Sequence, residues 1–485
     1  MTTQAVDSHN VTRRTAQAVI WNYLSFGLGK LLVLVSTGIL ARLLDKEDFG
    51  LVGFATLTIN YLSVIQDLGL GAALIYRRDR VQEAANTVFT MNLAVGVLLS
   101  ALTALVAPAV AVYFREPEVT PLLRLLGLTF ILNALGAIHI VRLQRELAFG
   151  RKMIPDLARA TVKGFAGIGF ALLGLGAWSL VWGQIAGIIA GVILAWVVFP
   201  WLPRLQIERE IAGSMFRYGA SMLGINILGA LVSNIDYVIV GRVLGDEALG
   251  VYTLAYRLPE LLILNILWVV SAAVFPAYAA LQKDPDTLRR GFLVTLRFLE
   301  LVSVPLCLGL FLVADPLVRV AFGEKWLEAV PVVRILALFM LARSVGSNVG
   351  DVYKAIGRPD ILVKLGLIIL PPLVAALWYG TRYGLVGVAL AHLALAFVRT
   401  GLRLWVATRQ MDVGWREMVA EVMPAFAAGL ALLATGIPAL WFTRALPPLA
   451  RLLLITAAGG IGYLSIAWLL ARDSLRHAYH IVRAR

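Results

Sequence analysis

Seven cationic side chains lie inside stretches of the chain that are otherwise apolar, where a charged group is energetically costly. If each faced lipid at the centre of a bilayer, the cost would be ~2.5 to 3.5 kcal/mol per residue and on the order of 20 kcal/mol for the set. We therefore expect them to line a wet interior or to be paired. The acids in these stretches are fewer, so the interior is net positive and suits an anionic passenger. The cations are Lys30, Arg159, Lys163, Arg257, Arg297, Arg334 and Arg343.

Lys163 follows Arg159 by four positions, which stacks the two cations on one helix face with mutual repulsion. A diphosphate between them would relieve it, because Arg offers a planar fork and Lys a point charge. Arg159 also has an alternative explanation, since it lies near the cytoplasmic end of its span and could snorkel outward. Lys30 has no acid three or four positions away, so local structure explains it least.

The remaining cations have local alternatives. Arg257 with Glu260, and Arg297 with Glu300, have the spacing of ion pairs that only hold a helix together. Arg334 and Arg343 are nine positions apart and point to opposite helix faces, so one cavity cannot receive both. We favour Arg343. The predicted substrate-binding set is therefore Lys30, Arg159, Lys163, Arg257, Arg297 and Arg343.

Two carboxylates are candidates for binding a coupling ion, either H⁺ or Na⁺. Asp236 follows Asn226, Ser233 and Asn234 on a small, polar helix stripe, which should face the interior of a bundle. An intramembrane carboxylate is a default candidate for this role, although a structural, hydrogen-bonded Asp is the alternative. Asp67 is the weaker candidate, because it lies toward the cytoplasmic end of its span.

The elements that must position these side chains are membrane-spanning helices. With 60% hydrophobic and 15% charged residues over 485 positions, the chain is far too apolar for a soluble globular protein. Spans of roughly 20 apolar residues predict an all-α polytopic membrane protein of fourteen helices. Their approximate ranges are 16–44, 48–75, 83–112, 120–147, 153–174, 177–199, 215–243, 248–282, 288–314, 329–354, 360–380, 383–409, 415–442 and 447–471.

The net charge of +14 follows the loops rather than one soluble face. With a cytoplasmic N-terminus, 26 of the 43 Lys and Arg residues fall on the inside, Arg399 and Arg403 among them, and ten fall on the outside. This asymmetry predicts a multi-pass membrane protein with both termini in the cytoplasm. The first apolar run is too long for a cleavable signal and is itself expected to direct insertion.

The chain also contains a duplication. Residues 39–52 return as residues 239–252 with Arg42, Glu47 and Gly50 matching Arg242, Glu247 and Gly250. Six spans separate the copies, an even number, so the repeat is parallel and a solute site is expected between two lobes. We predict an N-terminal six-helix lobe at 1–200, its repeat at 201–410, and two additional helices with a basic tail at 411–485.

Several functions are disfavoured by what the sequence lacks. No loop exceeds about 15 residues, which leaves no room for an ATPase or glycosyltransferase domain, and no Walker A motif or zinc-binding pattern occurs. We expect neither enzymatic activity nor a cofactor beyond the coupling ion. The glycine-rich stretch 164–176 is better explained by close helix packing than by phosphate binding. The single Cys307 should be a packing residue.

Several phrases together resemble the polysaccharide transporter family, the lipid-linked oligosaccharide flippases of the multidrug/oligosaccharidyl-lipid/polysaccharide exporter superfamily. They are ILARLLDKEDFGLVGFATL at 39–57, QDLGLGAALIYRRD at 66–79, GLGAWSLVWGQ at 174–184, NIDYVIVGRVLGDEALGVYTLAYRLPE at 234–260, VFPAYAALQKD at 274–284 and YKAIGRPD at 353–360.

The resemblance implies a flippase of the bacterial inner membrane that passes an undecaprenyl-diphosphate-linked glycan from the cytoplasmic to the periplasmic leaflet, driven by an ion gradient. Its partners would be the lipid-linked glycan, membrane lipid, and a polysaccharide polymerase and co-polymerase, with no nucleic acid. Alternatives are a peptidoglycan-precursor flippase or a drug or ion antiporter of the same superfamily. A membrane glycan polymerase or ligase is less favoured, because it would need a larger outer loop for its catalytic groups.

Overall fold

The computed structural model describes residues 27–66, 71, 74, 79–146 and 148–470, and among these residues each segment that the sequence predicts to span the membrane is largely helical. The first predicted span is described only over residues 27–43. The chain divides into two compact units. Unit 1 extends to Asn234 and also includes Gly245–Gly250, while unit 2 holds Ile235–Leu244 and the chain from Val251 onward. The division into lobes at 1–200, 201–410 and 411–485 stays a prediction.

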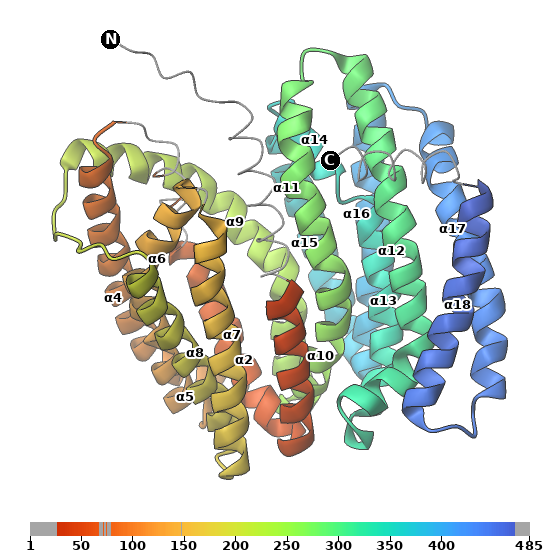
Figure 1. Cartoon of the computed structure of the whole chain (residues 1–485), viewed down its shortest axis with the longest axis horizontal. Coiled ribbons are helices and arrows are strands. Elements are labelled where there is room, and N and C mark those ends of the chain that lie inside the picture. Colours follow the sequence, from red (N-terminus) through yellow and green to blue (C-terminus); the bar gives the residue numbers. More distant parts are fainter. Residues whose placement is uncertain (1–26, 67–70, 72–73, 75–78, 147, 471–485) are drawn as a thin grey trace. The chain divides into compact units, whose positions relative to one another are not determined.

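Unit 1 is built from the helical segment 27–43 and six further helices, followed by the first part of α9 (Figure 1). These helices are α2 (Lys46–Gln66), α4 (Val81–Phe114), α5 (Val119–Gly127), α6 (Thr129–Arg145), α7 (Phe149–Leu172) and α8 (Ala177–Val198), and α9 itself runs over Arg209–Leu244.

Unit 2 begins within α9 and continues through a π-helical segment and two short 3₁₀ helices as well as α-helices. The elements are α10 (Asp246–Pro259), η1 (Glu260–Leu264), α11 (Asn265–Ala280), α12 (Pro285–Ala321), η2 (Glu324–Trp326), α13 (Ala329–Val345), α14 (Val349–Ala355), α15 (Asp360–Gly380), η3 (Thr381–Tyr383), α16 (Gly384–Met411), α17 (Trp415–Phe442) and α18 (Pro448–Leu470).

Length and hydropathy mark 11 helical stretches of the described residues as able to cross a membrane. One of them, Asp360–Met411, is 52 residues long and contains two of the predicted spans. The charged helix α7 is not among the 11 stretches, although it has 24 residues. The all-α polytopic membrane fold is thus confirmed.

Glycines set the distance between α7 and α8 in unit 1. A Cβ atom on Gly183 would lie 2.9 Å from the carbonyl oxygen of Lys163, and one on Gly187 would lie 2.6 Å from that of Arg159. At these two positions the backbones of α7 and α8 are so close that only the hydrogen atom of a glycine fits between them. Such contacts are typical of small-residue packing in membranes. Gly167 lies at the same contact, 2.9 Å from the Cβ position of Gly183, so the prediction of close packing for this stretch is confirmed.

In unit 2, α12 packs against α13, α17 and α18, and α16 packs against both α13 and α15 (Figure 1). Two ion pairs join α12 to α17: Arg289 with Glu417 at 2.5 Å, and Arg297 with Glu421 at 2.6 Å. Arg451 on α18 pairs with Asp315 on α12 at 2.7 Å. Cys307 is fully buried in this bundle, as expected of a packing residue.

Candidate functional site

The carboxylate of Asp236 is completely buried in unit 2, near the end of α9. The Tyr252 hydroxyl on α10 donates a hydrogen bond to its Oδ2 at 2.8 Å. His392 on α16 places Nδ1 3.5 Å from the same oxygen, and its ring packs against that of Phe339 at an interplanar angle of 38°, with centroids 4.1 Å apart. Among the described residues, Oδ1 of Asp236 has no hydrogen-bond partner. A buried carboxylate with an open lone pair beside an imidazole is chemically able to hold a small cation or a proton.

Three guanidinium groups interact electrostatically with one another, and one of them, Arg343, also interacts with this carboxylate. Arg343 on α13 interacts with both Asp236 and His392. It also interacts with Arg399 and Arg403 on α16. We call Arg343, Arg399 and Arg403 the arginine cluster. Its three positive charges exceed the single charge of Asp236, so the site is net cationic and would attract an additional anion.

Two members of the arginine cluster were missed by the sequence analysis, which counts Arg399 and Arg403 among the cytoplasmic cations. The structure continues α16 through both of them to Met411. A signal was available, because His392, Arg399 and Arg403 are separated by seven and four positions and therefore share one helix face.

A second cationic pair lies in unit 1 on α7. Arg159 donates to the side-chain oxygen of Asn133 on α6 at 3.1 Å, and Lys163 donates to that of Gln184 on α8. A side-chain amide solvates a cation but does not neutralise it. Asp156 interacts electrostatically with Arg159, so the pair keeps a net positive charge.

The other predicted residues are placed as follows. Lys30 is half-buried in the helical segment 27–43. Arg257 forms the local pair with Glu260 that its spacing suggested, at 3.4 Å. Arg297 pairs with Glu421 of α17, a partner that its sequence spacing did not suggest, and the fully buried Glu300 accepts a hydrogen bond from Ser344 at 3.2 Å. Asp67 lies outside the described residues.

The structure therefore brings together Asp236 and Arg343 within unit 2, and Arg159 and Lys163 within unit 1. Whether all six predicted cations converge on one cavity between lobes stays a prediction.

Comparison with known proteins identifies the family. A model described as "Polysaccharide biosynthesis protein" matches residues 39–331, more than half of the chain. The chain is 28% identical to the teichuronic acid biosynthesis protein TuaB of Bacillus subtilis (strain 168) over 94% of its length and 95% of TuaB. It is 26% identical to the succinoglycan biosynthesis transport protein ExoT of Rhizobium meliloti (strain 1021), over 100% of the chain and 98% of ExoT.

Among solved structures, the lipid II flippase MurJ in an inward closed conformation matches with a TM-score of 0.70 at 14% identity, covering 95% of this chain and 100% of MurJ. This likeness concerns the fold. The resemblance drawn from the sequence phrases is confirmed by the family match: the chain belongs to the polysaccharide biosynthesis protein family whose model spans residues 39–331.

Proposed function

We propose that the protein is a flippase that moves an undecaprenyl-diphosphate-linked oligosaccharide from the cytoplasmic to the periplasmic leaflet for export of a surface polysaccharide. Family membership supports this proposal, as do relatives named for teichuronic acid biosynthesis and succinoglycan transport and a fold shared with a lipid II flippase. The chain moves its substrate by alternating access and does not alter it chemically.

The observation that carries the proposal is the arginine cluster. Arg343, Arg399 and Arg403 lie on helices within candidate membrane spans, yet they interact electrostatically with one another, and Arg343 also interacts with the Asp236 carboxylate. Repulsion among guanidinium groups away from bulk water is costly unless an anion compensates it. A diphosphate is such an anion, and Arg binds it with paired hydrogen bonds.

The alternatives differ in the passenger. A peptidoglycan-precursor flippase would use the same diphosphate chemistry, so only the glycan distinguishes it from our proposal. An exporter of cationic drugs is disfavoured, because a net cationic site repels such a passenger. The lipid tail would stay in the bilayer, and a polymerase with its co-polymerase would receive the flipped glycan.

For the driving force, we propose that Asp236 binds the coupling ion, H⁺ or Na⁺, with Asp67 as the weaker candidate. Support for Asp236 comes from its complete burial, from its Oδ1, which accepts no hydrogen bond from the part of the chain that the structure describes, and from its interaction with Arg343 of the arginine cluster. Ion binding at Asp236 would change the charge that Arg343 experiences. The ion and the anionic passenger would then influence each other through Arg343.

We further propose that the protein lies in the bacterial inner membrane with both termini in the cytoplasm, because the inside loops carry most of the cations. A reporter active only in the periplasm, fused after Arg485, should stay silent. Activity of that fusion would overturn the orientation.

The function is tested with the purified protein in vesicles containing a fluorescent undecaprenyl-diphosphate oligosaccharide, in which a reductant quenches only the outer leaflet. Arg343→Ala, Lys163→Ala and Lys30→Ala should each slow transbilayer movement about tenfold or more, the effect of losing one charge-assisted hydrogen bond. Lys30→Arg should restore part of the rate. Arg444→Ala is the matched control, because Arg444 is exposed and stacks on Trp441 just beyond the end of α17.

Insertion and thermal stability should be unchanged in all these variants. If the wild-type protein moves no lipid-linked glycan, the flippase assignment is wrong. Parental rates in the three alanine variants would instead assign the cations to structure.

A further inference from the structure

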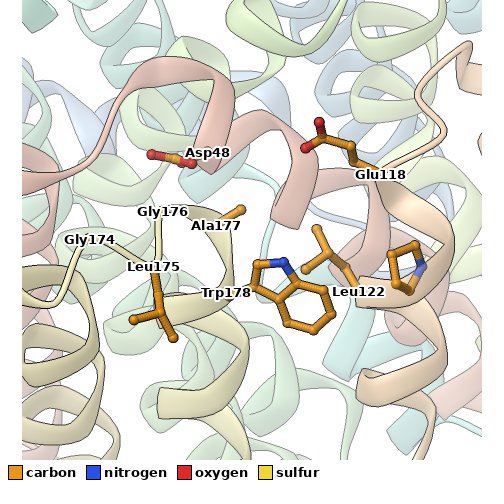
Figure 2. A pocket seen from close by; sticks show the side chains of 9 residues that line it. Asp48, Glu118, Leu122, Gly174, Leu175, Gly176, Ala177 and Trp178 are labelled. Atoms are coloured by element: carbon orange, nitrogen blue, oxygen red, sulfur yellow. The ribbon is translucent and has the colours of Figure 1, made fainter.

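Unit 1 contains an open pocket of about 400 Å³ whose lining does not belong to the cationic sites. Its walls come from the start of α2, the start of α5 and the connection between α7 and α8. Figure 2 shows the carboxylates of Asp48 and Glu118 on opposite sides of the pocket, with the indole of Trp178 between and below them. Leu122 and the backbone of Gly176 also line the pocket.

Two sequence phrases that the transport mechanism leaves unexplained meet at this pocket. Asp48 belongs to the phrase at 39–57, and Trp178 belongs to the phrase at 174–184. Gly176 allows them to meet: its φ is 53°, and a Cβ atom there would lie 2.9 Å from Oδ1 of Asp48. A side chain at this position would displace the Asp48 carboxylate and would have to adopt a positive φ that L residues rarely take, so glycine suits this connection.

We propose that this pocket is a subsite for an uncharged sugar ring of the transported glycan, an inference that rests on the proposed function. Carboxylate oxygens accept short, strong hydrogen bonds from hydroxyl groups. A Trp indole offers a large apolar face with a polar N–H at its edge, and such a face packs against the C–H groups of a pyranose. A pocket of this volume, mixing an apolar surface with a few polar groups, has the usual character of a small-molecule site.

The charge of the pocket selects against an anion. Glu116, close to Glu118 in the chain, interacts electrostatically with Glu118, Glu47 and Asp246, so the surroundings of Glu118 are acidic. A diphosphate or a uronic acid would be repelled here, in contrast to the arginine cluster. The pocket therefore complements the cationic sites: one kind of site takes the charged linkage and the other takes a neutral ring.

The position of the pocket fits this role. It lies at the end of unit 1 where α4 passes into α5 and α7 into α8, and the charge asymmetry of the loops assigns that end to the periplasmic side. A glycan that emerges on the periplasmic side would therefore pass close to the pocket. The subsite would retain the sugar portion after flipping and oppose its return.

The experiment is saturation-transfer difference NMR on the full-length protein in detergent, with methyl glucoside and its matched anion methyl glucuronide as probes. We expect transfer to the glucoside and little to the glucuronide. Trp178→Ala and Glu118→Gln should weaken glucoside binding about tenfold, the loss of roughly one strong contact. Trp182→Ala on the same helix is the control, because Trp182 is 39% exposed and does not line the pocket.

Three outcomes overturn the inference: no transfer to the glucoside, equal transfer to the glucuronide, or unchanged glucoside binding in both pocket variants. Glu118 is exposed, so Glu118→Gln should fold normally even if Trp178→Ala does not. The NMR result is independent of flipping. If the wild-type protein flips glycan while the pocket variants bind glucoside normally, the subsite is wrong and the flippase assignment stands. If the wild-type protein does not flip, the assignment fails and NMR still judges the pocket.

Discussion

Gly50 and Asp246 are in such close contact that a Cβ atom on Gly50 would lie 2.0 Å from the backbone carbonyl oxygen of Asp246. The contact is reciprocal. A Cβ atom on Gly250 would lie 2.1 Å from the carbonyl oxygen of Lys46, and positions 46 and 50 are the duplicates of positions 246 and 250. The Lys46 ammonium also pairs with Glu247 at 3.0 Å. The duplicated segment thus packs against its own copy, with the Gly245–Gly250 segment held as part of unit 1.

Gly50→Ala and Gly250→Ala should each destabilise the protein, because a methyl group cannot fit against a backbone carbonyl without moving a helix. Overpacking of this kind costs about 1–3 kcal/mol. The thermal unfolding midpoint in detergent, followed by circular dichroism, should fall in both variants by similar amounts, since the two contacts are equivalent.

Gly169→Ala is the control for these variants. Gly169 lies in α7, and a Cβ atom there would meet nothing within 4 Å. The control should match or exceed the wild-type stability, because Ala favours helix over Gly. A normal midpoint in Gly50→Ala would show that α2 and α10 do not approach this closely.

The ion pair between Arg297 and Glu421 should hold α17 against α12. Arg297→Gln leaves the Glu421 carboxylate, 23% exposed in its side chain, without this cation, and should lower stability by roughly 1–3 kcal/mol. The charge exchange Arg297→Glu with Glu421→Arg should recover part of the loss, which a double-mutant cycle of unfolding midpoints would measure. No coupling between the two sites would show that the pair adds nothing to the packing of α17.

The spanning helices could be predicted from the sequence more fully than the partners of the charged side chains, and the difference has a physical reason. A spanning helix is a local feature, because about 20 apolar residues must satisfy their backbone hydrogen bonds within the segment. This is why the predicted ranges from 83–112 to 447–471 are helical over almost all of their described residues, although 120–147, 248–282 and 329–354 each contain more than one helix. The partner of a charge is a tertiary feature. Spacing gave Arg257 its partner Glu260, but it did not give Arg297 the partner Glu421, which lies 124 positions away.

The arginine cluster illustrates the same limit. Arg343 was favoured from its helix face, and the structure places it within range of Asp236. Arg399 and Arg403 were assigned to the cytoplasm because the positive-inside rule counts cations near helix ends without regard to helix face. A rule that considers which face of a helix each cation occupies would have grouped Arg399 and Arg403 with His392.

The carboxyl group of Glu116, which lies outside the membrane-spanning helices, should make the stability of the protein depend on pH. Burial, followed by the nearby Asp246, Glu118 and Glu47 carboxylates, raises the pKa of Glu116 above its usual value. A raised folded-state pKa means that the folded protein disfavours the ionised form. Stability therefore declines as pH rises from about 4, the unfolded value, through the folded pKa, and the loss persists above it.

Glu116→Gln should consequently be more stable than the wild-type protein at pH 7, and the advantage should vanish near pH 4. Unfolding midpoints measured across this range would test the expectation. The exposed Glu118→Gln is the control, because its carboxylate is one neighbour of Glu116 and its removal should give a smaller effect of the same sign. An advantage for Glu116→Gln that grows toward low pH would contradict the electrostatic explanation.

Asp236 gives the prediction that separates coupling from structure. Asp236→Asn keeps the size of the side chain and an oxygen for the Tyr252 hydroxyl, but it removes the negative charge near Arg343. We expect this variant to bind lipid-linked glycan and to lose gradient-driven accumulation in vesicles. Tyr252→Phe is the matched control, since it removes only the hydrogen bond and should retain much of the transport.

The identity of the ion follows from applying a proton or a sodium gradient to the same vesicles. A carboxylate 3.5 Å from a histidine nitrogen is suited to holding a proton, whereas hard metal cations prefer oxygen ligands, so the proton gradient should drive the wild-type protein. His392→Gln should then weaken the response to pH without abolishing glycan binding. Full transport by Asp236→Asn under either gradient would make Asp236 a structural residue, and the arginine cluster would have to couple to an ion bound elsewhere.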